Sequence, residues 1–500
     1  MPPPEPGSSP APRQPALSVS CKGFKPAASG AASDLGSPGS SPAPTWHTTA
    51  RRCEYTIARM MRLATILIFG CASLIVSASQ DPRATPASAT KSPESPARPS
   101  PQQLAWHDHE IGMFIHIAPQ TWQDSESDSL STPLSAINPE KLDTDSWVRV
   151  AESMGAKYIV FVAKHEGGFC WWQTETTDFG VRNTPWRGGK GDVLADLAAA
   201  CRKRGMKLGV YLSPQDRKHG VAVGGRAKAP SQQPAYEALF RRQLVEVLSK
   251  YGDMAEVWFD GNLVFDVGDI LATHAPNAVV FQGPQASIRW VGNEDGVAPD
   301  PAWNAVNVPS PGVKWGDYTA AQSVFGGRGW LPIECDARLR ATWFWRTDNV
   351  RTLKSVDQLM DMYYRSVGHG AVLLLNVTPD RTGLMPEPDA QRAAEFGETI
   401  RRRLGTPVAE TRGTGTVLTL TLKVPARIEH VVVMENLAGG ERVREYTVEG
   451  RIQGQWQPVA SGTAIGHKKI DRIAPTLVDA LRLQITRSAG TPDIRRFAAY

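Results

Sequence analysis

From Trp106 to about Ile400, short runs of consecutive apolar residues alternate with longer segments in which apolar residues recur at helical spacing. Runs that are apolar throughout are typical of strands buried on both faces of a parallel sheet. About 300 residues of such strand–helix units favour a closed (β/α)8 barrel over an open sheet. The expected strands are Gly112–Ile117, Lys157–Val162, Lys207–Leu212, Glu256–Phe259, Ala278–Phe281 and Ala371–Leu375, and those between about 283 and 350 stay unplaced.

Two of the expected strands end at an ionisable side chain. Gly112-Met-Phe-Ile-His116 ends at an imidazole, and Glu256-Val-Trp-Phe-Asp260-Gly261 reaches a carboxylate. The C-terminal tips of barrel strands open onto the face where such enzymes place their chemistry. Asp260 is therefore a candidate carboxylate nucleophile. The alternative is that Asp260-Gly261 only reverses the chain, as this dipeptide does in many turns.

The last part of the chain, residues 401–500, has a different pattern. Short segments of alternating polarity are separated by turn residues, which predicts a β-sandwich behind the barrel. The role left open for this domain is either sugar binding or structural support of the barrel. The expected strands are Thr416–Thr421, His430–Val433, Tyr446–Gly450 and Leu481–Ile485.

The residues before the barrel do not read as a folded domain. Residues 1–59 are rich in Pro, Ser, Ala and Gly, which predicts a disordered or wrongly assigned extension. Residues 60–78 combine a charged start, a short apolar stretch and small residues, as a secretory signal peptide does. Residues 79–103 resemble a linker. We therefore expect a periplasmic or secreted protein with no membrane span in its mature form.

Charge and cysteine content exclude several classes of protein. The formal net charge of +5 is small for 500 residues, and no basic cluster with interleaved aromatics suggests a nucleic-acid partner. No Gly-rich phosphate loop is present. Cys170, Cys201 and Cys335, the cysteines that follow the signal segment, do not form a disulfide framework.

Polar side chains gather at the predicted strand ends, beside tryptophans. His116, His165, Glu166, Tyr211 and Asp260 all follow or end an apolar run. A single buried histidine is usually structural, but several converging polar groups with aromatic walls suit a sugar. A sugar offers C–H faces to aromatic rings and hydroxyls to hydrogen-bonding groups.

Taken together, and in their order, six segments resemble glycoside hydrolase family 29, the α-L-fucosidases, over roughly residues 104–400. They are Met113–Trp122, Ala163–Phe169, Lys207–Pro214, Val257–Gly261, Arg289–Glu294 and Leu374–Gly383. The tail also resembles the C-terminal domain of that family. The resemblance implies a barrel enzyme that needs no metal or cofactor and acts on fucosylated oligosaccharides or glycoconjugates.

The resemblance also implies roles for individual residues. Asp260 takes the place of the nucleophile in a retaining double displacement. Glu294, in Trp290-Val-Gly-Asn-Glu294, matches the acid/base of the branch that cleaves α-1,3 and α-1,4 linkages. Read alone, Glu294 is a solvated turn residue. In a retaining enzyme the two carboxyl groups should lie about 5–5.5 Å apart.

The resemblance assigns the remaining site residues to the sugar. His116, His165, Tyr211 and Trp258 would hold the fucose, and Trp122 and Trp303 would form walls for a second sugar. The family commonly has a second histidine where this chain has Glu166, which puts one hydroxyl contact in doubt. The Gln120-Thr121-Trp122 segment is a milder departure from the family pattern.

Two alternatives to this function remain from the sequence. A metal-dependent hydrolase on the same barrel would use His116, His165, Glu166 and Asp260 as ligands, although the first strand lacks a His-x-His pair. A non-catalytic carbohydrate-binding protein would have lost one of the two catalytic carboxylates, and both are present.

Overall fold

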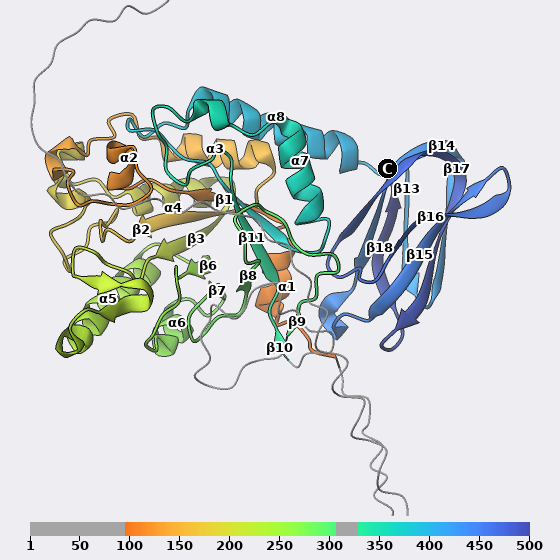
Figure 1. The fold of residues 1–500 in the computed structure, drawn as a ribbon, viewed down its shortest axis with the longest axis horizontal. Helices are drawn as coiled ribbons and strands as arrows, with labels where there is room; N and C mark the ends of the chain where they lie inside the picture. The colour runs from red at the N-terminus through yellow and green to blue at the C-terminus, as the bar shows by residue number, and fades with distance from the viewer. Residues whose placement is uncertain (1–95, 307–328) are drawn as a thin grey trace, which may run out of the picture. The chain divides into compact units, whose positions relative to one another are not determined.

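The computed structural model describes residues 96–306 and 329–500 (Figure 1). The predicted extension, the predicted signal peptide and all but the end of the predicted linker lie outside these residues. Within them, no helix is long and apolar enough to cross a membrane. The cysteines of this part, Cys170, Cys201 and Cys335, are buried and form no disulfide.

Eight parallel strands form the nearly closed barrel that the sequence predicts. Their order is β7-β6-β3-β2-β1-β12-β11-β8, and a parallel bridge between Phe281 and Ile288 connects the two edge strands. Strands β8 and β11 lie in the segment that the sequence pattern left unplaced. The strands are β1 (Ile111–Ile115), β2 (Tyr158–Lys164), β3 (Lys207–Leu212), β6 (Met254–Trp258), β7 (Val279–Phe281), β8 (Arg289–Trp290), β11 (Ile333–Arg338) and β12 (Val372–Asn376).

Helices cover the outside of the barrel, and local sequence sets several of their ends. The Asp143 side chain caps α3 at the backbone N–H of Ser146, and Asp192 caps α4 at Ala195. Both helices end at a glycine in the left-handed conformation, Gly155 and Gly205. The helices are α1 (Pro101–His107), α2 (Pro119–Gln123), α3 (Thr144–Met154), α4 (Val193–Arg204), α5 (Gln233–Lys250), α6 (Gly268–His274), α7 (Val356–Arg365) and α8 (Glu387–Leu404).

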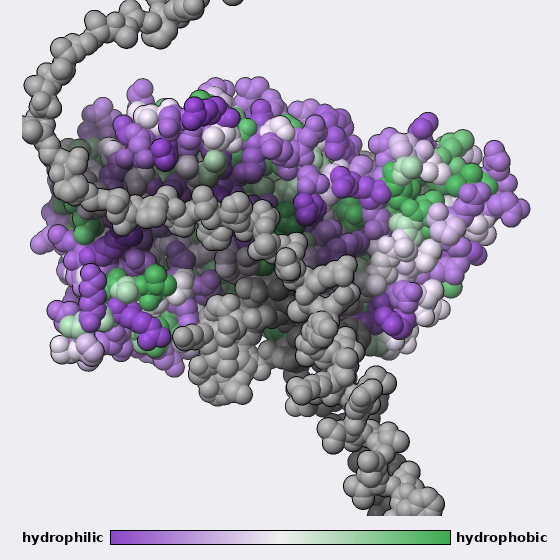
Figure 2. All heavy atoms as spheres, viewed as in Figure 1, coloured by the Kyte–Doolittle hydropathy of each residue, from purple (hydrophilic) through white to green (hydrophobic). Residues whose placement is uncertain are grey.

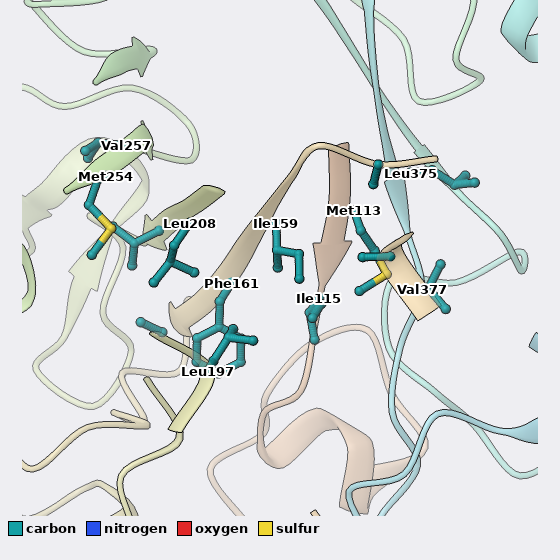
Figure 3. Packing of buried hydrophobic residues seen from close by; sticks show 14 of the residues in the cluster. Met113, Ile115, Ile159, Phe161, Leu197, Leu208, Met254, Val257, Leu375 and Val377 are labelled. Carbon is teal, nitrogen blue, oxygen red and sulfur yellow. The ribbon is translucent and has the colours of Figure 1, made fainter. Parts of the chain in front are cut away.

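The two faces of the barrel strands pack into different clusters. Outward-facing residues pack against the helices, as Figure 3 shows for part of this cluster. The residues labelled there include Met113, Ile115, Ile159, Phe161, Leu208, Val257 and Leu375. Inward-facing residues form a smaller, more aromatic cluster that contains Phe114, Tyr158, Tyr211, Trp258 and Phe281. The strands are thus buried on both faces, which explains their unbroken apolar runs.

The C-terminal domain is a separate antiparallel sheet of six strands, ordered β13-β18-β14-β17-β15-β16. Two segments expected as separate strands, Thr416–Thr421 and His430–Val433, belong to one long strand, β14. The first half of β14 pairs with the second half of β17, which also pairs with β15. The second half of β14 pairs with β18. Both halves bury side chains in one core, so the continuous sheet folds into the expected sandwich. The strands are β13 (Ala409–Thr414), β14 (Val417–Glu435), β15 (Val443–Ile452), β16 (Gln455–Gly462), β17 (Lys469–Ser488) and β18 (Asp493–Ala499).

Two further ladders of two-residue strands complete the strands of the described residues. They are β4 (Val221–Ala222) with β5 (Arg226–Ala227), and β9 (Ala305–Val306) with β10 (Gly329–Trp330). On the surface, Figure 2 shows apolar residues gathered on part of the C-terminal sheet. The exposed large apolar residues of β14 and β17 are Val417, Val424 and Leu477. Elsewhere on this face polar residues dominate.

Polar contacts join the C-terminal sheet to the barrel. The Tyr364 hydroxyl at the end of α7 hydrogen-bonds to His430 over 2.9 Å. The buried Glu441 carboxylate accepts hydrogen bonds from the backbone and side-chain N–H groups of Asn304, over 3.1 and 2.8 Å. Asn304 lies between β8 and β9, so the domain stabilises the chain that follows the sixth barrel strand.

Candidate active site

A cavity of about 440 Å³ opens at the C-terminal ends of the barrel strands. It is the face on which a (β/α)8 enzyme carries its active site. Of the nine site residues predicted from the sequence, the cavity brings together six: His116, His165, Tyr211, Trp258, Asp260 and Glu294. Aromatic rings supply much of the remaining wall, including Phe114, Phe281, Trp290, Trp343 and Phe344.

Asp260 lies two residues beyond the end of β6 and opens onto the cavity. The Tyr211 hydroxyl donates a hydrogen bond of 2.8 Å to Oδ2 of Asp260. Burial by the surrounding wall raises the pKa of Asp260, the Tyr211 hydrogen bond lowers it, and the nearby Glu294 charge raises it. Burial and the nearby Asp260 charge raise the pKa of Tyr211 well above its usual value, so its hydroxyl keeps its proton and stays a donor. The arrangement provides an ionisable carboxylate that is held in place and faces open space.

Glu294 lines the same cavity from the segment that follows β8. Its carboxylate lies 3.1 Å from the Arg338 guanidinium, and 42% of its side chain is exposed. Gly292 and Gly296 flank it with φ of 92° and 70°, a conformation that favours glycine. A carboxyl group that meets solvent on one side and the cavity on the other is suited to exchange protons.

Two histidines line the cavity as neutral rings. His116 Nδ1 lies 2.8 Å from Oδ1 of Asn376, whose amide donates to the Trp343 carbonyl and so presents an acceptor to the histidine. Gln120 Nε2 lies 2.9 Å from Nδ1 of His165. Burial lowers the pKa of His116 well below its usual value and that of His165 to about 3. Both imidazoles are therefore hydrogen-bonding groups rather than charges near neutral pH.

A stack of rings runs from His165 through Tyr211 and Trp258 to Phe281 in β7, and we call this stack the floor of the cavity. His165 stacks on Tyr211 with ring centroids 5.5 Å apart, and Tyr211 stacks on Trp258 at 5.2 Å. Trp258 stacks in turn on Phe281 at 3.8 Å. A floor of this kind offers flat apolar surface beside hydrogen-bonding groups, which is what a sugar ring needs.

Three predicted contacts lie outside the cavity wall. Glu166 forms an ion pair of 3.0 Å with Arg217 and accepts a hydrogen bond from the Asp128 backbone. It is thus held beside the site and not in it, and the structure gives no support for its predicted sugar contact. This arrangement follows from its partners, because Arg217 and the Asp128 backbone engage the two carboxylate oxygens of Glu166.

The two tryptophans predicted as outer walls are also absent from the cavity. Trp122 lies in α2, near Trp171, at a separate hollow lined by Ser and Thr residues. The Trp303 ring lies under the Arg444 guanidinium of the C-terminal domain, 5.0 Å from its centroid. Neither ring lines the cavity that contains Asp260 and Glu294, so their predicted role at a second sugar has no support at this cavity.

Other cavity residues were not found from the sequence. They include Glu126, Asn262, Gln282, Asp336, Trp343 and Phe344. The Glu126 carboxylate accepts hydrogen bonds from the backbone of Trp343 and Phe344, over 3.0 and 3.4 Å, and so orders this aromatic pair. The Trp343-Phe344-Trp345 run was a usable signal, but it falls in the segment where no strand was assigned.

Two carboxyl groups meet below the floor, inside the barrel. Glu334 accepts hydrogen bonds from Trp258 Nε1 at 2.8 Å and from the Tyr158 hydroxyl at 3.1 Å, and Glu256 accepts one from Trp106 Nε1 at 2.9 Å. Burial raises the pKa of Glu256 to about 7, and burial together with the Glu256 charge raises the pKa of Glu334 well above its usual value. A protonated Glu334 thus lies against Glu256 beneath Trp258.

The ligand set proposed for a metal hydrolase is not gathered in one place. Within residues 96–306 and 329–500, no cluster of three or more His, Cys, Asp or Glu side chains could hold a metal ion. His116, His165 and Asp260 line the cavity, whereas Glu166 is paired with Arg217 outside it.

Comparisons with known proteins agree with the resemblance seen in the sequence. The α-L-fucosidase family model matches residues 130–403. Alpha-L-fucosidase 1 of Arabidopsis thaliana is 31% identical over 452 residues, which cover 80% of this chain and 87% of the plant protein. A glycoside hydrolase 29 family member from an unknown rumen bacterium is 31% identical, with a TM-score of 0.74 over 81% of this chain and 77% of its own. A Ruminococcus gnavus GH29 fucosidase in complex with fucose is 25% identical, with a TM-score of 0.71 over 82% and 97% of the two chains.

Proposed function

This chain belongs to the α-L-fucosidases of glycoside hydrolase family 29, and we propose that it releases terminal fucose with net retention, using Asp260 as nucleophile and Glu294 as acid/base. The observation that carries this assignment is their common cavity. Asp260 and Glu294 line it from different strands, Tyr211 donates to Asp260, and neutral histidines and stacked aromatic rings complete the wall.

In the first step, an oxygen of ionised Asp260 attacks the anomeric carbon while the glycosidic C–O bond breaks. Glu294, protonated, gives its proton to the departing oxygen, which leaves as an alcohol. The product is a β-linked fucosyl ester on Asp260. In the second step, Glu294 takes a proton from water, the water oxygen attacks the same carbon, and the ester bond to Asp260 breaks. Two inversions give α-fucose.

The other cavity groups support binding and charge development. The free Nε2 atoms of His116 and His165 are available to sugar hydroxyls, because their Nδ1 atoms are engaged by Asn376 and Gln120. Stacking of the sugar on the Trp258 floor would fix the ring over Asp260. The orientation of both histidines is set before the substrate arrives, which limits the ordering cost of binding.

We further propose a preference for α-1,3- and α-1,4-linked fucose on branched glycans. The support is the Trp290-Val-Gly-Asn-Glu294 segment, which resembles the branch of the family with that preference. Binding energy from the neighbouring sugar would then lower the barrier at the fucose, so truncated substrates should react more slowly. The predicted signal peptide at residues 60–78 supports a periplasmic or secreted location, which fractionation of cells expressing the full chain would test.

The decisive experiment combines stereochemistry with two variants. Proton NMR in the first minutes of reaction should show α-fucose before β-fucose. Asp260→Gly should lose turnover, and added azide should partly restore it by forming a fucosyl azide. An initial β-fucose signal would refute retention, and near-normal activity of Asp260→Gly would remove Asp260 from its role. For linkage, a Lewis-type trisaccharide should exceed an α-1,2-linked disaccharide in kcat/KM, and the reverse order would refute the proposed preference.

A further inference from the structure

The strand β11 presents three ionisable side chains to the inside of the barrel. Its residues alternate: Ile333, Cys335 and Ala337 pack outward in the apolar core, and the residues between them face the opposite way. Bulky branched side chains usually fill the inside of such a barrel. Here the inward positions are Glu334, Asp336 and Arg338. Glu334, the first of them, contacts Trp258, and Arg338, the last, contacts Glu294.

The upper two of these side chains hold the segment that carries Glu294. Trp290 Nε1 donates a hydrogen bond of 2.6 Å to Oδ1 of Asp336, and Arg338 lies 3.1 Å from the Glu294 carboxylate. The Arg338 guanidinium also lies over the Trp343 ring, 5.3 Å from its centroid, so it connects Glu294 to the aromatic wall. Both contacts come from β11, which runs beside β8 (Figure 1).

The segment needs such support because its own structure is sparse. Strand β8 has only two residues, Arg289–Trp290, and the following chain turns through two glycines with positive φ. The backbone N–H of Val291 bonds to the Glu334 carbonyl at 2.9 Å, and Asp295 forms one bridge with Ala337. These bonds fix the path of the backbone but not the direction of a half-exposed carboxylate.

We propose that Asp336 and Arg338 are positioning residues for proton transfer at the leaving group: Asp336 anchors Trp290, and Arg338 orients the Glu294 carboxylate. This inference rests on the proposed role of Glu294 as acid/base. Burial raises the pKa of Asp336 well above its usual value, so Asp336 holds Trp290 as a neutral acceptor and leaves Arg338 as the partner charge of Glu294.

Leaving-group chemistry separates positioning of the acid from a general structural effect. An aryl fucoside with 2,4-dinitrophenolate as leaving group needs no proton, whereas phenyl fucoside does. We expect Arg338→Met to lower kcat/KM for phenyl fucoside by roughly ten- to a hundred-fold, as a misplaced catalytic group does. The value for the dinitrophenyl substrate should change less than roughly three-fold, because that reaction does not use general acid catalysis.

Matched variants sharpen the comparison. Arg338→Lys keeps the charge and should recover part of the loss, and Asp336→Asn keeps an acceptor for Trp290 and should stay closer to the wild-type protein than Asp336→Leu. Arg451→Met is the control, since Arg451 also pairs with a carboxylate, Asp479, and lies over a tryptophan, Trp456, but in the C-terminal sheet. It should leave both substrates unchanged.

Glu294→Ala is the reference for complete loss of the acid. If it slows phenyl fucoside selectively but Arg338→Met slows both substrates equally, or neither, then the positioning role is wrong and the acid/base assignment stands. If Glu294→Ala itself slows both substrates equally, the proposed function fails, and the inference fails with it. Because Arg338 is partly exposed, Arg338→Met decides the question even if Asp336→Leu does not fold.

Discussion

Replacing Glu334 by glutamine should remove much of the pH dependence of stability in the barrel. Glu334 has no solvent exposure, accepts hydrogen bonds from Trp258 and Tyr158, and meets Glu256. Glutamine has the same shape as a protonated glutamate. Its carbonyl can still accept from Trp258, and its amide can donate to Glu256 where the carboxyl proton did. The change therefore fixes the neutral state and leaves the packing intact.

The size of the effect follows from proton linkage. In the unfolded chain a glutamate ionises near its ordinary pKa of 4.5, whereas burial keeps Glu334 protonated in the folded protein to much higher pH. Because the folded-state pKa is the higher one, the stabilisation is complete below pH 4.5 and is lost as pH rises. Each such carboxyl lowers the free energy of unfolding by about 1.4 kcal/mol per pH unit. From pH 5.5 to 7.0 this amounts to about 2 kcal/mol, which the variant should not lose.

Urea unfolding followed by tryptophan fluorescence at pH 5.5, 6.0, 6.5 and 7.0 measures the effect. The variant minus wild-type difference in unfolding free energy should rise by about 2 kcal/mol over this range, whatever its value at pH 5.5. Glu398→Gln, at an exposed position of α8, is the control and should give a constant difference. A constant difference for Glu334→Gln as well would show that Glu334 is ionised in the folded protein, and the account of the barrel interior would be refuted.

Three further predictions concern the site and its support. Tyr211→Phe removes the hydrogen-bond donor that lowers the pKa of Asp260. The acidic limb of the pH profile of kcat/KM should therefore move to higher pH by about one unit, and an unmoved limb would contradict the role of that hydrogen bond. Lys164→Met removes the lysine that pairs with the fully buried Asp216 at 3.3 Å, and it should lower the free energy of unfolding in urea by about 3–5 kcal/mol. Lys203→Met, at an exposed ion pair, should lower it by less than about 1 kcal/mol, and equal losses would refute this prediction. Incubation with a chelator should leave activity unchanged, and loss of activity that zinc restores would favour the metal-dependent alternative.

The sequence pattern predicted the barrel because strands that are buried on both faces are runs of consecutive apolar residues. The run Lys207–Leu212 is apolar after its first residue and forms β3 with the expected bounds. Strand β8 has no such run, since it is two residues long and owes its place to pairing with β11. Strand β11 was not predicted for another reason. Its Glu334, Asp336 and Arg338 break the apolar run, although all three face the interior of the barrel.

The limits of prediction at the site have the same physical origin. His116 and Asp260 could be found because each ends an apolar run and a strand tip points its side chain at the cavity. Glu166 could not be placed, because its direction depends on Arg217, a residue 51 positions later in the chain. Trp343 and Phe344 reach the cavity through a backbone ordered by Glu126, a contact across 217 and 218 positions. Such contacts depend on tertiary structure, which no local pattern records.

Two buried carboxyl groups of this barrel, Glu334 and Asp336, are compatible with the catalytic pair because burial keeps them neutral. The charge that raises the pKa of Asp260 comes from Glu294, and neither Glu334 nor Asp336 contributes a comparable effect. If Glu334 and Asp336 were ionised, two additional negative charges would lie inside the barrel near the nucleophile and oppose its ionisation. Tryptophan and tyrosine side chains donate hydrogen bonds to Glu334 and Asp336 without adding positive charge. The interior thus supplies acceptors that hold Trp258 and Trp290 in place without adding charge beside Asp260 and Glu294.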